Sequence, residues 1–593
     1  MPSEFDKNVL SRLLRRGWSP ALVLVCALLA YSDSPRNGFT WDDHIYVEDN
    51  AFVRDPRNLR LLLDPRFYLE PRNVLAGSRP VFLGSLAVDR ALWGDKAGGY
   101  HLTNVLLHAA NSLWVYRLAY ALCGPVQGAA LLSGLLFALH PVQSEAVNAI
   151  TFRADLLAAF FTFAALAAFL AARRASRTGF LLRLAACGAC AALGLLSKES
   201  AAALPLLLLL VELYIPSRGW TALRLAAAAL VLAAVLAPYA VFRSARPGYA
   251  AMRAAPKTWE AALPRDNARS AAPKTVFVQP GEAGLALLPS PPPWDAAYER
   301  AGGRLRLSAA ALARELRLLL WPSPLVVDRD PPEAAGAPSL AELGGWALLL
   351  LWAGAALALR RRAPSAGLGL AWCLAALVPV CGLVPLYNPA AERYLYTAAA
   401  GAAWALAWAF RSAPWPPGWM RATDRGLSRG SAASRALGAA AAAALLAGFG
   451  LRTHARCSDW ASDEVLFWSM PDSLASAKVR YNRGNIRLQQ GRLQDAGEEY
   501  RAALRLRPGY AEAWLNLGSL YRYSGDAAAA FACYEKAAAA NPRSPLPPYV
   551  HGRFLEERGE TARARSRYEA ALAAAPDFAP ARRRLDALRG GGP

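Results

Sequence analysis

The stretch Gly484–Pro508, GNIRLQQGRLQDAGEEYRAALRLRP, is followed by two stretches in which the same kinds of residue stand 34 positions later. This period is typical of tetratricopeptide (TPR) repeats, which are pairs of antiparallel helices. We expect the small residues to let the two helices approach closely, the tyrosine to pack between units and the proline to end the second helix. The recurring positions are Gly484, Gly518 and Gly552; Gly491, Gly525 and Gly559; Tyr500, Tyr534 and Tyr568; Ala503, Ala537 and Ala571; and Pro508, Pro542 and Pro576.

The repeats predict a TPR α-solenoid of about three units over 477–593, preceded by a linker over 453–476. Stacked TPR units present a concave surface, which most often holds an extended peptide or a protein partner. We therefore expect this domain to bind an acceptor or partner protein and not to be catalytic itself.

The preceding 452 residues predict a polytopic membrane domain, in a chain of 593 residues that is 55% hydrophobic. The fold class expected for the whole chain is therefore all-α. About eleven apolar segments are candidates for membrane helices. They lie near 18–34, 100–121, 125–140, 154–172, 179–196, 200–215, 222–242, 343–359, 366–386, 394–411 and 433–451. The apolar but charged stretches 80–93 and 306–321 read as interfacial helices.

The net charge of +22 raises the question of nucleic-acid binding. The arginines, however, stand mostly in short loops between apolar runs, which is the pattern that orients membrane proteins. With the N-terminus inside, every motif described below falls on the outer face, together with a Pro-rich loop near 243–304 and the TPR domain. We expect no nucleic-acid partner.

Charged residues next to membrane segments are costly and are therefore functional candidates. The first group is Asp42 and Asp43 with His44, just after the first apolar segment. Two adjacent carboxylates can raise the pKa of one of them, which suits a general base. The alternative is a solvated loop cap, and the residues alone do not say which aspartate would be the base.

The second group joins two membrane segments and begins with His140-Pro141, where the proline stops the helix. It continues with Glu145, Arg153 and Asp155. Arg153 at a helix start could bind phosphate, and a plain ion pair with Glu145 is the alternative.

The third and fourth groups are Lys198-Glu199 and Glu392-Arg393-Tyr394, each at the edge of a membrane segment. A lysine–glutamate cap and an interfacial tyrosine anchor are the ordinary readings. On the same face as the acidic pair, Lys198 and Arg393 become candidates for phosphate binding and Tyr394 for sugar or lipid contact.

An acidic pair and several cations on one face suit glycosyl transfer from a polyprenyl-phosphate sugar. A carboxylate takes the proton of an acceptor hydroxyl, and cations stabilise the departing phosphate. The sequence contains no Walker loop, HExxH or GxSxG motif. The CxxC of Cys187 and Cys190 lies within an apolar run without a second pair, so no metal site or cofactor is predicted.

These motifs, in this order and followed by TPR units, resemble the transmembrane and TPR repeat-containing O-mannosyltransferases, and more broadly bacterial relatives within the GT-C glycosyltransferase class. The resemblance covers nearly the whole chain. It implies that Asp42 or Asp43 is the catalytic base, that Arg153, Lys198 and Arg393 lie near the donor phosphate, and that the donor is a lipid-phosphate sugar. In eukaryotic members the donor is dolichyl-phosphate mannose and the acceptor a Ser or Thr of secretory-pathway proteins.

The chain departs from the animal members in having only about three TPR units, and its Ala- and Arg-rich composition indicates a bacterial source. The carrier would then be undecaprenyl phosphate, and the active site and TPR domain would face the periplasm; in a eukaryote they would face the lumen of the endoplasmic reticulum.

We therefore predict a membrane-bound, inverting O-glycosyltransferase, with mannose or another hexose as the sugar and with no obligatory divalent metal. The alternatives are a non-catalytic scaffold that recruits proteins through its TPR array and a transporter of lipid-linked sugars. The candidate site residues are Asp42, Asp43, His44, His140, Glu145, Arg153, Asp155, Lys198, Glu199, Glu392, Arg393 and Tyr394.

Overall fold

A computed structural model describes most of the chain. The described residues are 18–64, 79–124, 126–216, 222–245, 301–330, 339–382, 388, 390–412, 432–576 and 578–590. Within these ranges all regular structure is helical, as the all-α expectation requires. The Pro-rich loop predicted near 243–304 lies almost entirely outside the described residues.

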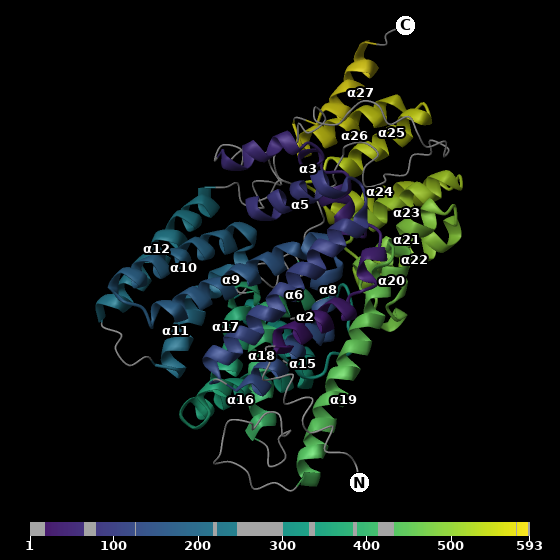
Figure 1. Ribbon diagram of the computed structural model, residues 1–593. Coiled ribbons are helices and arrows are strands. Elements are labelled where there is room, and N and C mark those ends of the chain that lie inside the picture. Colours follow the sequence, from purple (N-terminus) through teal and green to yellow (C-terminus); the bar gives the residue numbers. More distant parts are fainter. Residues whose placement is uncertain are drawn as a thin grey trace.

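Each of the predicted apolar segments contains a helix, and together these helices form a bundle (Figure 1). They are α2 (Trp18–Ala30), α6 (Ala97–Leu122), α7 (Gln127–Leu139), α9 (Arg153–Ala172), α10 (Arg177–Ser197), α11 (Leu204–Tyr214), α12 (Ala222–Ala245), α16 (Leu340–Arg362), α17 (Pro364–Leu377), α18 (Leu395–Ser412) and α19 (Ala432–Cys457).

By length and composition, four helical stretches in the described part of the chain could cross a membrane, so the count of about eleven spans is not confirmed. They are Ile150–Ala172, Thr178–Ser197, Leu340–Arg362 and Ala436–Trp460. A fifth would be the bent pair that α7 forms with residues Pro141–Asn148, which meet at 47°. Pro141 accounts for the bend because it cannot continue the helix of α7.

The core of the bundle is apolar, with α17 against α18 as one of its tightest contacts. A Cβ atom added to Gly369 would lie 2.4 Å from the carbonyl oxygen of Gly401, so only glycine permits this approach. Trp372 and Trp404 pack edge to face beside it, with ring centroids 5.0 Å apart. This contact holds α18, which begins directly after the predicted residues Glu392–Tyr394.

Two amphipathic helices, α5 (Pro80–Trp93) and α15 (Ala301–Leu320), coincide with the predicted interfacial stretches. Several short helices link the main ones at one end of the bundle. They are η1 (Ser34–Arg36), η2 (His44–Glu48), α3 (Ala51–Arg54), η3 (Pro56–Leu63), η5 (Pro141–Gln143), α8 (Ser144–Asn148), η6 (Ile150–Phe152), η7 (Glu199–Ala203), η9 (Val378–Val380) and η10 (Glu392–Tyr394). We call this end, which carries all four groups of charged motifs, the loop face.

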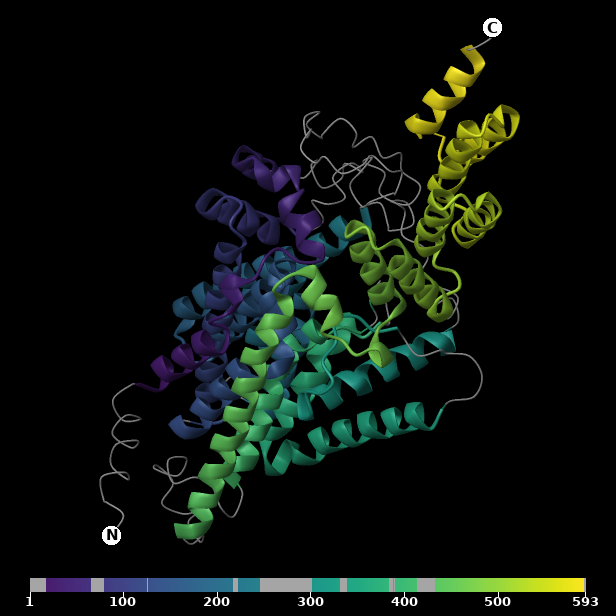
Figure 2. The same cartoon turned by 90° about the vertical axis from the view of Figure 1, so that its right-hand side faces the viewer.

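The repeat region folds as three helix pairs and a final helix, which extend away from the bundle (Figure 2). The helices are α21 (Ala477–Gln489), α22 (Leu493–Leu506), α23 (Ala511–Tyr523), α24 (Ala527–Ala540), α25 (Leu546–Glu557), α26 (Thr561–Ala574) and α27 (Ala579–Gly590). In each pair the repeated glycine faces the repeated tyrosine: a Cβ added to Gly484 would lie 2.6 Å from the Tyr500 ring. The tyrosine thus packs within its own unit, while the Tyr500 hydroxyl accepts a bond from Asn516 of the next unit.

The segment between α19 and α21 is folded and packs on the loop face. It contains η12 (Ser458–Trp460), α20 (Asp463–Trp468) and η13 (Asp472–Leu474). Its Trp460, Leu466 and Phe467 are buried in one cluster with Ala149 and Phe152 of the bundle. The predicted linker is therefore an ordered bridge between the two domains.

Candidate functional site

We call residues 40–44, which contain Asp42 and Asp43, the acidic loop. Asp43 is a buried carboxylate that holds this loop against the bundle. Its Oδ1 accepts a hydrogen bond from the backbone N–H of Thr151 at 2.9 Å, and its Oδ2 accepts from Thr40 at 3.3 Å and Ile150 at 3.4 Å. Burial raises the pKa of Asp43 to about 7, although these hydrogen bonds oppose the rise. Both oxygens are occupied, which favours a structural role.

Asp42 differs from its neighbour because its carboxylate is free. The side chain is half-buried, and in the part of the chain that the structure describes it forms no hydrogen bond or ion pair. Its position is fixed nonetheless, since Asp43 and Trp41 on either side are both tied to distant elements. A positioned and accessible carboxylate is what a general base requires.

Trp41 is held in a strained backbone conformation with φ at 53°. Its N–H donates to Oδ1 of Asp463 in α20 at 2.7 Å. Its ring packs edge to face on Phe152 and Phe467, with centroids 6.1 and 6.3 Å away, and Lys478 Nζ lies 4.6 Å from its centre. The contacts that keep Trp41 in this conformation come from the bundle, from α20 and from the first TPR helix. The conformation of the acidic loop therefore depends on both domains.

His44 forms two ion pairs that hold its ring in place. Its Nδ1 lies 2.6 Å from Glu48 Oε2 and its Nε2 lies 3.2 Å from Asp463 Oδ2. The hydrogen bond to Asp463 and that to Glu48 raise the pKa of His44 to about 9 against the opposing effect of burial. The ring is therefore charged at neutral pH and helps Asp463 to fix the loop.

Two of the predicted phosphate-binding cations are paired with carboxylates of the second motif group. Arg393 Nη1 lies 2.5 Å from Glu145 Oε1, and the Arg393 N–H donates to Glu145 Oε2 at 2.8 Å. Lys198 Nζ lies 2.6 Å from both oxygens of Asp155. The structure thus joins segments that are 248 and 43 residues apart in the chain.

A third pair of the same kind is Arg79 with Glu199, whose atoms approach to 2.9 Å. Sequence reasoning missed Arg79, because an arginine before a proline at the start of an amphipathic helix gives no sign of its partner. The three pairs contain equal numbers of cations and carboxylates, so the cluster is close to neutral when all six groups are charged.

We call the ion pairs Arg393–Glu145, Lys198–Asp155 and Arg79–Glu199 the cation pairs. Tyr394 and Phe152 connect them to the acidic loop. The centre of the Tyr394 ring lies 5.3 Å from Lys198 Nζ and 5.2 Å from Arg393 Cζ. Arg393 Cζ also lies 4.1 Å from the centre of Phe152, and the same ring packs against Trp41. Phe152 therefore bridges the carboxylate and cation halves of the site, although in the sequence it is one apolar residue among many.

Arg153 is fully buried, and its donors are satisfied inside the bundle. It lies 2.5 Å from Asp89 Oδ2 of α5, and it donates to Asn104 Oδ1 at 2.7 Å and to the Tyr100 carbonyl oxygen at 2.9 Å, both in α6. These contacts join α5, α6 and α9. They favour a structural role over direct contact with a phosphate.

His140 is also buried and bonded on both nitrogens. Its Nδ1 accepts from the Val142 N–H at 3.2 Å, which leaves Nε2 to donate to the Leu319 carbonyl oxygen at 3.1 Å. Its ring packs on Phe449 of α19, 4.7 Å away between centroids. The residue thus ties α15 and α19 to the break after α7.

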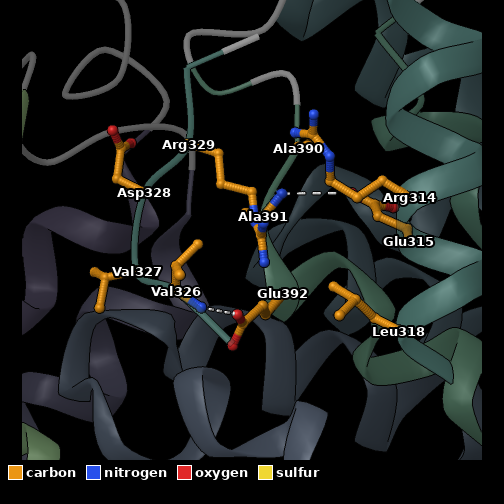
Figure 3. Close-up of a pocket in the computed structure, with 10 residues that line it drawn as sticks. All are labelled: Arg314, Glu315, Leu318, Val326, Val327, Asp328, Arg329, Ala390, Ala391 and Glu392. Carbon is orange, nitrogen blue, oxygen red and sulfur yellow. Dashed lines mark hydrogen bonds between the residues drawn. The ribbon is translucent and has the colours of Figure 1, made fainter. Parts of the chain in front are cut away.

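Glu392 lines a pocket between α15 and the segment 326–329 (Figure 3). Its Oε1 accepts a hydrogen bond from the Val326 N–H, whereas its buried Oε2 has no partner. Burial raises the pKa of Glu392 to about 7. Since Arg393 follows directly in the chain, this pocket adjoins the cation pairs.

Comparison with known proteins agrees with the repeat assignment and with the resemblance. TPR-repeat and tetratricopeptide-repeat family profiles match residues 484–522 and 511–544. The chain is 35% identical over 134 residues to the protein O-mannosyl-transferase Tmtc1 of Drosophila melanogaster, which is 22% of this chain and 15% of that protein.

Two further relatives carry the same description. Identity is 33% over 189 residues to Tmtc2 of Drosophila melanogaster, covering 30% of this chain and 20% of the relative. It is 27% over 177 residues to human TMTC4, covering 27% and 24%. The matched segments are thus related to protein O-mannosyl-transferases, and the matches span less than a quarter of each of these relatives.

Among solved structures, an oligosaccharyltransferase of Archaeoglobus fulgidus aligns with 77% of this chain and 57% of its own, at 13% identity and a TM-score of 0.41.

Proposed function

We propose that this protein is an integral-membrane glycosyltransferase that moves a hexose, mannose foremost, from a polyprenyl-phosphate donor to a Ser or Thr hydroxyl of a protein. The observation that carries the proposal is the pair Asp42 and Asp43, in which one carboxylate is bound on both oxygens and the other is free at the loop face. The relationship of the matched segments to protein O-mannosyl-transferases supports the choice of reaction.

In this mechanism Asp42 is the general base. It accepts the proton of the acceptor hydroxyl while the hydroxyl oxygen attacks the anomeric carbon of the donor. The bond between that carbon and the phosphate oxygen breaks, and the lipid phosphate leaves with the electron pair. A single displacement of this kind inverts the configuration at the anomeric carbon.

Negative charge grows on the phosphate oxygen as it leaves, and nearby cations lower the barrier by stabilising it. Lys198 and Arg393 are the predicted contacts, because both stand beside Tyr394 and Arg393 also packs on Phe152, which contacts Trp41 of the acidic loop. In the described ranges no group of three or more His, Cys, Asp or Glu side chains could hold a metal ion, and metal independence stays a prediction.

The TPR array is proposed to bind the acceptor protein. Its first helix touches Trp41 through Lys478, so a peptide on the repeats would be held next to the acidic loop. This contact favours a role in acceptor delivery. A scaffold that only recruits proteins would need no contact with the acidic loop.

The test is transfer of radiolabelled mannose from polyprenyl-phosphate mannose to a Ser/Thr-rich peptide by the full chain in nanodiscs. Asp42→Asn should lower the rate by about 10²- to 10⁴-fold, the usual contribution of a general base. The melting temperature should stay near that of wild type, because none of the described residues forms a hydrogen bond or ion pair with the Asp42 carboxylate.

Three results would contradict the proposal. Equal transfer by wild type and Asp42→Asn would remove Asp42 as the base. Absence of transfer by wild type with any donor would favour the scaffold. Movement of the labelled lipid across the membrane without attachment to peptide would favour a lipid-linked sugar transporter.

A further inference from the structure

The pocket beside Glu392 is lined by two arginines, Arg314 and Arg329. Neither the sequence patterns nor the proposed mechanism gives them a role. The pocket is lined by Arg314, Glu315 and Leu318 of α15, by residues 326–329 and by residues 390–392 (Figure 3). Arg314 enters from the helix and Arg329 from the opposite segment. Both side chains are half-buried.

Within the part of the chain that the structure describes, neither arginine forms an ion pair, although Glu315 interacts with Arg314 and Glu392 with Arg329 through their charges. Arg329 Nη2 donates to the Pro324 carbonyl oxygen at 2.6 Å, and Arg314 makes no hydrogen bond. Most of their ten N–H donors are thus available. By contrast, Arg153, Lys198 and Arg393 each already hold a carboxylate.

An arginine fork that faces a pocket is well suited to a phosphate group, which it can bind through two parallel hydrogen bonds. A phosphate would not have to displace any carboxylate from Arg314 or Arg329. At Lys198 or Arg393 it would have to compete with Asp155 or Glu145.

The two glutamates of the pocket do not oppose an anion as strongly as their number suggests. Burial raises the pKa of Glu315 to about 8 and that of Glu392 to about 7, so each is substantially protonated at neutral pH. Glu392 Oε2 is buried without a partner, and in its protonated form it could donate a hydrogen bond to a phosphate oxygen.

The surroundings favour a phosphate that carries a lipid chain. The helix α15 ends beside the pocket at Leu320 and is followed by Trp321, and these side chains are 53% and 69% exposed. Exposed apolar and tryptophan side chains at the end of an amphipathic helix are typical of a membrane interface. On its other side the pocket shares Val326 with the apolar cluster that contains Phe152.

We infer that Arg314 and Arg329 bind the phosphate group of a membrane lipid carrier in this pocket. The inference rests on the proposed function for the identity of the carrier, a polyprenyl phosphate. It adds two direct ligands to the donor site and places the phosphate between the membrane interface and the cation pairs.

The test measures binding of radiolabelled polyprenyl monophosphate, without a sugar, to the full chain in nanodiscs. Arg314→Gln and Arg329→Gln should each weaken binding by about 10- to 100-fold, the cost of a lost charged hydrogen bond. The matched control is Arg317→Gln, one turn further along α15, whose side chain is exposed and bonded to Ser323; it should bind within twofold of wild type.

Equal binding by wild type and both variants would overturn the inference, as would competition by inorganic phosphate with no binding of the lipid. If a glutamine variant fails to fold, Arg314→Lys and Arg329→Lys replace it, since they keep the charge but lose the fork and should still weaken binding. Because the probe carries no sugar, the two claims can be contradicted separately. If binding depends on these arginines but the wild type transfers no sugar, only the proposed function is contradicted. If both variants keep full transfer, only the assignment of this pocket is contradicted.

Discussion

Lys478 Nζ, on the first TPR helix, lies 4.6 Å from the centre of the Trp41 ring in the acidic loop. The backbone of the same tryptophan is bound by Asp463, which stands just before the TPR array. The segment that positions Asp42 is therefore shaped in part by the domain proposed to bind the acceptor. Protein binding to the repeats and proton transfer at the Asp42 carboxylate therefore depend on the same contacts.

Asp463→Asn tests this relationship. The substitution removes the charge that pairs with His44 and weakens the acceptor for the Trp41 N–H. We expect faster hydrogen exchange in a peptide spanning residues 38–48 and a fall in transfer of about 10- to 100-fold, because small displacements of catalytic groups are costly. Hydrogen-exchange mass spectrometry of the full chain in nanodiscs provides the first measurement.

The matched control is Asp495→Asn, which breaks an exposed pair with Arg492 at the start of α22. It should change neither exchange in the acidic loop nor transfer. Unchanged exchange in the loop of Asp463→Asn would show that the bridge between the domains does not shape the site.

Asp43 should make stability fall as the pH rises. Its pKa is about 7 in the folded protein against 3.8 in the unfolded chain, so the folded state binds more protons between these values. The wild type should therefore lose stability from pH 4 to pH 7, whereas Asp43→Asn cannot titrate at this position. We expect the melting temperature of wild type minus that of the variant to fall up to pH 7 and to level off above it.

Taking this difference at each pH cancels the titration of all other groups. A difference that stays constant from pH 5 to pH 8 would mean that the three backbone hydrogen bonds offset burial and that the pKa of Asp43 is not raised, because the carboxyl would then be ionised in both states throughout this range. Scanning fluorimetry at intervals from pH 5 to pH 8 is sufficient to tell the two cases apart.

The sequence was informative where a signal is local or periodic. Apolar runs predicted the helices of the bundle, and the recurrence of Gly484 and Tyr500 in later units predicted the TPR pairs, because each pattern reports the face that a helix buries. Positive charge in short loops further led us to group the four charged motifs on one face, and in the structure they are in contact: Arg393 pairs with Glu145, Lys198 pairs with Asp155, and Trp41 packs on Phe152.

The sequence could not identify partners that come together only in three dimensions. Asp42 and Asp43 are equivalent as neighbours in the chain, and they differ only because the N–H of Thr151 lies against one of them. Arg153 resembles a phosphate ligand until Asp89 is seen beside it. The contacts of Asp463 with the acidic loop, 422 residues away, have no local signal at all.

Arg153 and Asp89 form a buried ion pair, so the effects of substituting them on the free energy of unfolding should not be additive. Asp89→Asn alone leaves a buried guanidinium without its counter-charge, which costs about 3–5 kcal/mol. The double variant Asp89→Asn, Arg153→Gln removes both charges and should recover part of that loss. Melting temperatures of the two single variants and the double variant provide the cycle.

An exposed pair serves as the comparison for this cycle. Asp55→Asn breaks the contact with Arg57 on the loop face, where the arginine is exposed and the aspartate half-buried, and should barely change the melting temperature. If the Asp89 and Arg153 variants were simply additive, the pair would not be the main link between α5 and α9.

The last prediction concerns the close packing inside the second TPR unit. A Cβ added to Gly518 would lie 2.8 Å from the Tyr534 ring and 3.1 Å from Cys533 Cβ, so Gly518→Ala must push α23 and α24 apart. Overpacking of this kind costs about 1–3 kcal/mol. Gly509→Ala is the matched control, because a Cβ there meets no atom within 4 Å. Hydrogen exchange in the α23 and α24 peptides of the full chain should accelerate in Gly518→Ala and not in Gly509→Ala, whereas equal exchange in both variants would contradict the steric role assigned to the repeated glycine.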